Sequence, residues 1–134
     1  MLDHMTFRVT DIGRAKAFYS AALAPLGYTL AFEGNYGMNI LGFAYPDPAE
    51  PDGKKADVWF IDGPSPHGGP AATSGCHLAW RAESRAQVDA FYHAAGPAGF
   101  DTDHDYRGHV RVATGADDGA EMQFQISTKL QAAV

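Results

Sequence analysis

Two short segments of the chain alternate strictly between hydrophobic and polar residues. The first is "HMTFRV" (residues 4–9) and the second is "HLAWRA" (residues 77–82). A period of two places successive side chains on opposite faces of a strand, so each segment is typical of a strand with one buried face. The buried sides would hold Met5, Phe7 and Val9 in the first segment, and Leu78, Trp80 and Ala82 in the second.

A helical pattern follows each of these strands. The first helix is predicted to begin near Asp11 and to end around "PLG" (residues 25–27), because a glycine commonly follows a helix end. In the second, Ser84 and Gln87 have the spacing of a capping box. The apolar stripes recur at helical spacing and contain Ala15, Phe18, Tyr19 and Ala22, then Val88, Phe91, Tyr92 and Ala95.

The two halves also resemble each other in sequence. Aligning His77 with His4 matches Arg81 with Arg8 and places the second "AFY" (residues 90–92) on the first (residues 17–19). Ala94 and Ala95 then fall on Ala21 and Ala22, which makes seven identities in nineteen positions without a gap. We interpret this as an internal duplication, which gives a repeated fold.

Further strand patterns follow each helix. They are "YTLAFE", "YGMNILGFAY" and "ADVWFI" in the first half, and "GHVRVAT" and "AEMQFQI" in the second. The turn-rich stretch 45–55 indicates a loop, and the glycine- and proline-rich stretch 63–75 indicates a linker. We therefore expect one domain over residues 1–134, with module one at about 1–62, the linker at about 63–75 and module two at about 76–128.

Composition narrows the classes of protein that fit. The net charge of -6 argues against nucleic-acid binding, which needs clustered Lys and Arg. No apolar run approaches the ~20 residues that span a bilayer, so we expect no membrane interaction. The start of the chain lacks a secretory pattern and the single cysteine suits a reducing compartment, so a cytoplasmic location is expected.

Strand alternation also predicts which side chains lie opposite the helices. This set comprises His4, Thr6, Arg8, His77, Ala79 and Arg81 from the leading strands, and Asp57, Trp59, Ile61, Glu121, Gln123 and Gln125 from the closing strands. If the sheets curve toward each other, these mostly polar residues converge in a cleft. The alternative is an ordinary solvated sheet face.

Two arginines on this predicted face suggest what the cleft would bind. Arg8 and Arg81 would favour an anionic ligand, because a guanidinium pairs bidentately with a carboxylate or phosphate. The alternative is that they form ion pairs with Asp57 or Glu121 across the sheet. Trp59, Tyr36 and Tyr106 could supply a stacking surface for a planar ligand, or they could serve only in packing.

The order of these motifs resembles a known family. "DHMTFRVTDIGRAKAFYSAALAPLGY" and "GCHLAWRAESRAQVDAFYHAAGPAGF" are similar to the first and second modules of the glyoxalase/bleomycin-resistance/extradiol-dioxygenase superfamily, the vicinal oxygen chelate proteins. "GHVRVATGADDGAEMQFQ" resembles the closing hairpin and strand of that family. The resemblance implies an α+β fold in which two βαβββ modules form a curved mixed sheet with a cleft. The helices would lie on the outer face of this sheet, and the protein would be a homodimer.

Metal-binding members of the family carry ligands on the first and last strand of each module. Carried onto this chain, these positions are His4, Trp59, His77 and Gln123. Trp59 cannot bind a metal, and Gln123 offers only a neutral oxygen where a glyoxalase usually has a glutamate. The resemblance therefore implies a divalent metal (Zn, Ni, Fe or Mn) held by His4, His77 and Gln123. Strand alternation independently offers Arg8, Trp59, Arg81 and Glu121 as the substrate-binding residues.

Two functions remain open at this level. One is a divalent-metal-dependent lyase, isomerase or dioxygenase that acts on a small anionic or oxygen-rich molecule. The other is a metal-free protein that binds or sequesters a small molecule, as the resistance branch of the family does. The paired histidines favour the first, while Trp59 and Gln123 at ligand positions favour the second.

Overall fold

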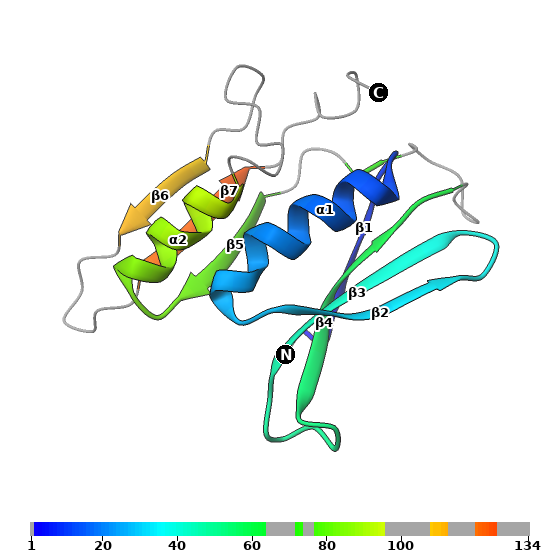
Figure 1. Cartoon of the computed structure of the whole chain (residues 1–134), viewed down its shortest axis with the longest axis horizontal. Helices are drawn as coiled ribbons and strands as arrows, with labels where there is room; N and C mark the ends of the chain where they lie inside the picture. Colours follow the sequence, from blue (N-terminus) through cyan, green and yellow to red (C-terminus); the bar gives the residue numbers. More distant parts are fainter. Residues whose placement is uncertain (1, 64–71, 74–76, 96–107, 113–119, 126–134) are drawn as a thin grey trace.

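The computed structural model describes residues 2–63, 72–73, 77–95, 108–112 and 120–125, with 77–79 and the last two ranges as backbone only. Figure 1 shows two helices lying along two sheets of mixed α+β architecture. In the first half, β1 (Met5–Arg8) leads into α1 (Ile12–Leu23) and the 3₁₀ turn η1 (Ala24–Leu26), followed by β2 (Thr29–Asn35), β3 (Asn39–Pro46) and β4 (Lys54–Ile61). In the second half, β5 (His77–Ala82) and α2 (Arg85–Ala95) precede β6 (Gly108–Val112) and β7 (Ala120–Gln125).

Both helices begin where their sequences predict, and the first also ends there. The Asp11 carboxylate accepts a hydrogen bond from the Arg14 amide at 2.8 Å, and Gly27 ends the first helical region with a φ of 85°. At α2, the Ser84 hydroxyl accepts from the Gln87 amide at 3.2 Å. The Gln87 side chain accepts from the Glu83 amide at 2.6 Å, one residue before the usual partner in a capping box.

The four-stranded sheet has the order β1-β4-β3-β2. β1 runs parallel to β4, while β4, β3 and β2 are antiparallel neighbours. The predicted loop at 45–55 is the connection between β3 and β4, where Asp47 and Gly53 close a turn. The first half therefore has the strand, helix, three-strand order that its sequence predicts.

The second sheet has the order β5-β7-β6, and both of its pairings are antiparallel. The closing strand β7 thus runs antiparallel to the leading strand of its half, whereas β4 runs parallel to β1. The described parts of the two halves are therefore similar in element order but different in strand direction.

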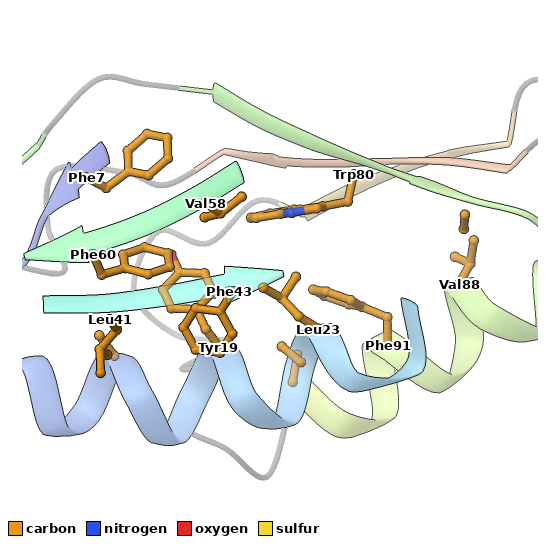
Figure 2. Packing of buried hydrophobic residues seen from close by; sticks show 14 residues of the cluster. Phe7, Tyr19, Leu23, Leu41, Phe43, Val58, Phe60, Trp80, Val88 and Phe91 are labelled. Carbon is orange, nitrogen blue, oxygen red and sulfur yellow. The ribbon is translucent and has the colours of Figure 1, made fainter. Parts of the chain in front are cut away.

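One hydrophobic core joins the two halves. Tyr19 on α1 stacks on Phe60 of β4 with ring centroids 3.9 Å apart, and its ring also lies 6.4 Å from that of Trp80 on β5. Trp80 in turn contacts Phe91 of α2, with 6.4 Å between centroids. Figure 2 shows these side chains between the strands and the two helices. The alternation is confirmed here, because Phe7, Val58, Phe60, Trp80 and Ala82 are all buried.

Because Tyr19 contacts rings of both halves, its removal should weaken the whole domain. We expect Tyr19→Ala to lower the free energy of unfolding by about 3–5 kcal/mol, as for other buried aromatic residues. Urea unfolding followed by tryptophan fluorescence and by circular dichroism would measure this, and the two probes should give coincident transitions. Ser20→Ala, on the exposed side of the same helix, is the control and should change stability little. Two separate transitions in the wild-type protein would contradict a shared core.

Candidate functional site

The face of the β1–β4 sheet opposite α1, here called the open face, carries the candidate site. Register and alternation place eight residues on it: Thr6, Arg8, Phe32, Gly34, Ile40, Gly42, Trp59 and Ile61. The sequence predicted a mostly polar face from β1 and β4, and the structure adds apolar residues from β2 and β3. Apart from Thr6 and Arg8 on β1, the open face is made of aromatic, aliphatic and glycine residues.

Trp59 lies flat against the neighbouring strand. Its indole N–H donates to the Ala56 carbonyl at 3.2 Å, and its six-membered ring covers Gly42 of β3. A Cβ atom at Gly42 would stand 2.8 Å from Cζ3 of the indole, so only glycine leaves the ring this room. The hydrogen bond and the glycine together fix the indole as a half-buried, preformed surface on the open face.

Two β-bulges decide which side chains reach the open face. The register between β3 and β4 shifts after Phe43, so that Asp57 is the extra residue. The Asp57 carboxylate accepts from the Tyr28 hydroxyl at 3.1 Å, and Tyr28 packs against the core. The prediction that Asp57 faces the cleft is therefore wrong, because the bulge turns it toward the helix side.

The surroundings of Asp57 are unusual for a carboxylate. Burial is the main cause that raises its pKa, while the hydrogen bond from Tyr28 acts in the opposite direction. Burial also raises the pKa of Tyr28, and the nearby Asp57 charge adds to this. Oδ1 of Asp57 is enclosed and has no hydrogen-bond partner in the structure as described. The ionised form of Asp57 therefore lowers the free energy of unfolding.

Arg8 extends from β1 at the end of the open face. Its guanidinium donates to the Gly63 carbonyl, and its backbone amide donates to the Thr73 hydroxyl at 2.9 Å. Its Nε is enclosed and has no partner among the residues the structure describes. The predicted alternative of an ion pair between Arg8 and Asp57 is wrong, because Asp57 is bonded to Tyr28.

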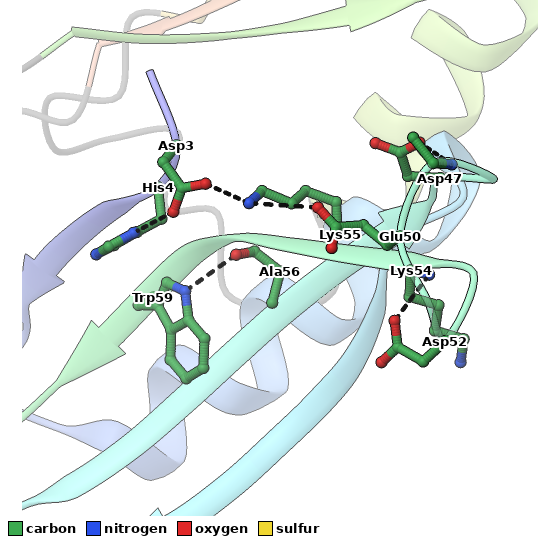
Figure 3. A network of polar contacts seen from close by, with 10 residues as sticks. Asp3, His4, Asp47, Glu50, Asp52, Lys54, Lys55, Ala56 and Trp59 are labelled. Carbon is green, nitrogen blue, oxygen red and sulfur yellow. Dashed lines mark hydrogen bonds and ion pairs between the residues drawn. The ribbon is translucent and has the colours of Figure 1, made fainter. Parts of the chain in front are cut away.

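His4 stands just before β1 and is exposed. Its Nδ1 lies 2.8 Å from a carboxylate oxygen of Asp3, whose other oxygen pairs with Lys55 (Figure 3). Lys55 also lies 3.6 Å from Glu50. The hydrogen bond with His4, followed by the ion pair with Lys55, holds the pKa of Asp3 below its usual value. If Nδ1 carries the proton, Asp3 accepts it and Nε2 of His4 is left as an acceptor or ligand.

Neither Asp3 nor Lys55 was predicted as a site residue from the sequence. Their signal was weak, because Asp3 merely precedes His4 and Lys55 lies 52 residues further along the chain. Only the closure of the β3–β4 hairpin brings Lys55 to the start of β1. Phe32 was missed for a similar reason, because a second bulge, between Leu30 and Phe32, sets its face.

The second-half candidates are placed by backbone register. His77 stands opposite Gln125, and Gln123 stands opposite Ala79, so His77 and Gln123 are diagonal neighbours on one face. Arg81 is exposed and stands directly opposite Glu121, a register that suits the predicted cross-strand ion pair. The side chains of His77, Glu121 and Gln123 lie outside the described residues, so their roles stay predictions.

A divalent metal site is not complete in the part of the chain that the structure describes. No three His, Cys, Asp or Glu side chains gather there. Trp59 stands at the β4 position where the family resemblance implies a metal ligand. Its indole covers Gly42 and has no atom with a lone pair that could bind a metal. The first half therefore contributes a single imidazole, that of His4, and no carboxylate from β4.

Comparison with known proteins identifies the class. The family model of the Glyoxalase/Bleomycin resistance protein/Dioxygenase superfamily matches residues 1–124. The chain belongs to this superfamily, which confirms the resemblance read from the sequence. A search of the curated proteins finds no match to the chain. Neither helix in the described residues is long and apolar enough to cross a membrane.

The state of Asp57 can be tested by pH. A carboxyl group whose pKa is raised on folding stabilises the fold at low pH, and this contribution is lost as the pH rises from about 3.8 through the folded-state pKa. We expect Asp57→Asn to be more stable than the wild type at pH 7, by no more than about 1 kcal/mol because the side chain is partly exposed. Urea unfolding at several pH values should show the difference shrinking toward pH 4.

Tyr28→Phe is the matched control for this experiment. It removes the hydroxyl that favours the carboxylate form, so it should lower stability at pH 7 and enlarge the pH dependence. A less stable Asp57→Asn protein at pH 7 would contradict the assignment of Asp57 as a costly buried carboxylate.

Proposed function

We propose that the protein binds a small planar, anionic or oxygen-rich molecule on the open face, in the manner of the metal-free resistance branch of the superfamily. The observation that carries this proposal is the indole of Trp59, fixed over Gly42 at the position where metal-binding relatives have a ligand. A rigid aromatic surface binds a planar ligand without first having to be ordered.

The charge distribution supports an anionic group on the ligand. Arg8 pairs with Ile61 in the sheet register, two residues along β1 from Thr6, which pairs with Trp59. Two residues along a strand span ~7 Å, so a ring at Trp59 would have its substituent within reach of the Arg8 guanidinium. Arg81 and Glu121 of the second half would complete the polar rim of the cleft.

The assembly of the site belongs to the same proposal. Members of this superfamily commonly form dimers and bind small ligands. In the proposed arrangement, two βαβββ modules curve around the cleft and a second copy of the chain encloses it, in a cytoplasmic homodimer. An apolar open face in the isolated chain supports this, because large exposed apolar surfaces usually mark binding sites.

A metal-dependent lyase, isomerase or dioxygenase is the second candidate. The observation that favours it is the contact between Asp3 and His4, since metal-bound histidines usually bond a carboxylate through their other ring nitrogen. His4, His77 and Gln123 would be the ligands. This set lacks the carboxylate that a glyoxalase uses to move a proton, and β4 does not supply one.

Calorimetry with naphthalene-2-carboxylate, a planar anion, tests the first proposal. We expect Trp59→Ala to weaken binding about tenfold, in line with the loss of one stacking contact, and Trp59→Phe to weaken it less. Tyr92→Ala is the matched control, because Tyr92 is exposed on α2 and away from the open face. If the wild-type protein fails to bind, or if Trp59→Ala binds equally well, the proposal is wrong.

Metal analysis of untagged protein separates the two candidates. The metal-free proposal predicts well below about one ion per chain, with no change in His4→Ala or His77→Ala. About one ion per chain in the wild type, lost in both variants, would overturn it in favour of the metal-dependent enzyme. Circular dichroism of each variant would show whether the fold is retained.

A further inference from the structure

Three aromatic rings form a row across the open face. The rings of Trp59 and Phe32 are 5.6 Å apart between centroids, with their planes inclined by 50°, and the rings of Phe32 and Tyr36 are 6.4 Å apart. The planes of Phe32 and Tyr36 are inclined by only 12°. This aromatic row, defined as Trp59, Phe32 and Tyr36, runs from β4 past β3 to the edge strand β2 and its turn.

A glycine lies beneath each step of the aromatic row. Gly42 lies under the indole of Trp59, and Gly34 lies under the rings of Phe32 and Tyr36. A Cβ atom at Gly34 would stand 2.9 Å from Cζ of Phe32 and 3.2 Å from Cε2 of Tyr36. Neither glycine has a positive φ, so glycine is not needed for the backbone conformation here. It is needed because it has no Cβ atom to clash with the rings. Any larger residue would displace the rings from the backbone.

The backbone of β2 is also adapted to this arrangement. Leu30 pairs with Phe43 and packs against the core, whereas Phe32 pairs with Gly42 of the open face. Residues two apart normally share a face, and the bulge at Ala31 breaks that rule. Without the bulge, Phe32 would turn toward the helix side together with Leu30.

The exposed fraction of Tyr36 shows that the row is not core packing. Tyr36 is 74 % exposed, the highest value among the large aromatic residues of the described chain. Its ring contacts Phe32 and otherwise faces solvent. An exposed ring nearly parallel to its neighbour offers a face on which an aromatic ring of a ligand can stack.

We infer that the aromatic row binds a ligand with two or three linked rings that can turn relative to one another, oriented with its anionic group toward Arg8 and its far ring toward Tyr36. This rests on the proposed function and names the class of ligand within it. Each step of the row, 5.6 Å from Trp59 to Phe32 and 6.4 Å from Phe32 to Tyr36, is longer than one benzene ring is wide. A single benzene ring therefore stacks on one ring of the row, and further rings are needed to reach Phe32 and Tyr36.

The test compares carboxylates that differ only in ring number. Benzoate, biphenyl-4-carboxylate and p-terphenyl-4-carboxylate, whose rings can turn about the bonds that link them, would be titrated into the full-length protein by calorimetry. We expect the affinity of the wild type to rise about fivefold to tenfold with each added ring. In Phe32→Ala and Tyr36→Ala this rise should be lost for the third ring, while the affinity for benzoate stays within about twofold.

Tyr92→Ala is the control for nonspecific adsorption of larger aromatics, and it should keep the full rise with ring number. Tyr36 is so exposed that its replacement leaves the core intact, and light scattering would show whether it alters the oligomeric state. The inference is overturned if Tyr36→Ala and Phe32→Ala keep the rise, or if Tyr36→Ala changes oligomerisation alone, which would assign the row to a second copy of the chain.

The outcomes also separate this inference from the proposed function. Binding of all three carboxylates with equal affinity, weakened by Trp59→Ala, would overturn the inference and leave the proposed function standing. Binding of none of them would overturn both.

Discussion

The alternation of side chains across one four-stranded sheet determines the rest of the structure. Phe7, Val58 and Phe60 fall on the side that packs under α1, where Tyr19 stacks on Phe60. Burial of these residues fixes the register, because a slip of one residue would exchange the two faces. Because these residues pack under the helices, the residues that alternate with them along β1 and β4 face the opposite side. Residues at bulges are the exception.

The bulges are the places where the chain departs from this constraint, and each changes the chemistry of a face. One removes the Asp57 carboxylate from the open face and gives it to Tyr28 on the helix side. The other brings Phe32 onto the open face beside Trp59. The combined effect is to replace a charged surface with an aromatic one. This exchange is why the first half suits stacking better than metal binding.

The polar groups that remain lie at the rim of the apolar surface. Arg8 is bonded to the Gly63 carbonyl at one end, and His4 is bonded to Asp3, which Lys55 also holds. Exposed ion pairs of this kind add little stability, so their value would be to orient side chains toward a ligand. An apolar floor with a few oriented polar groups is the usual composition of a small-molecule site.

The sequence by itself determined the order of elements, both helix N-caps, most of the core stripes on α1 and α2 and membership of the superfamily, because these depend on local periodicity and short motifs. Tyr92, predicted in the apolar stripe of α2, is exposed instead. It also identified Trp59 as a departure from the metal-binding pattern. Only the tertiary structure decided the sides of Asp57 and Phe32, the glycine floor under the rings, the link from Lys55 to Asp3 and the antiparallel pairing of β5 with β7. These features depend on how strands far apart in the sequence pair. A bulge forms where one strand has an extra residue opposite its partner, so it cannot be recognised from either strand alone.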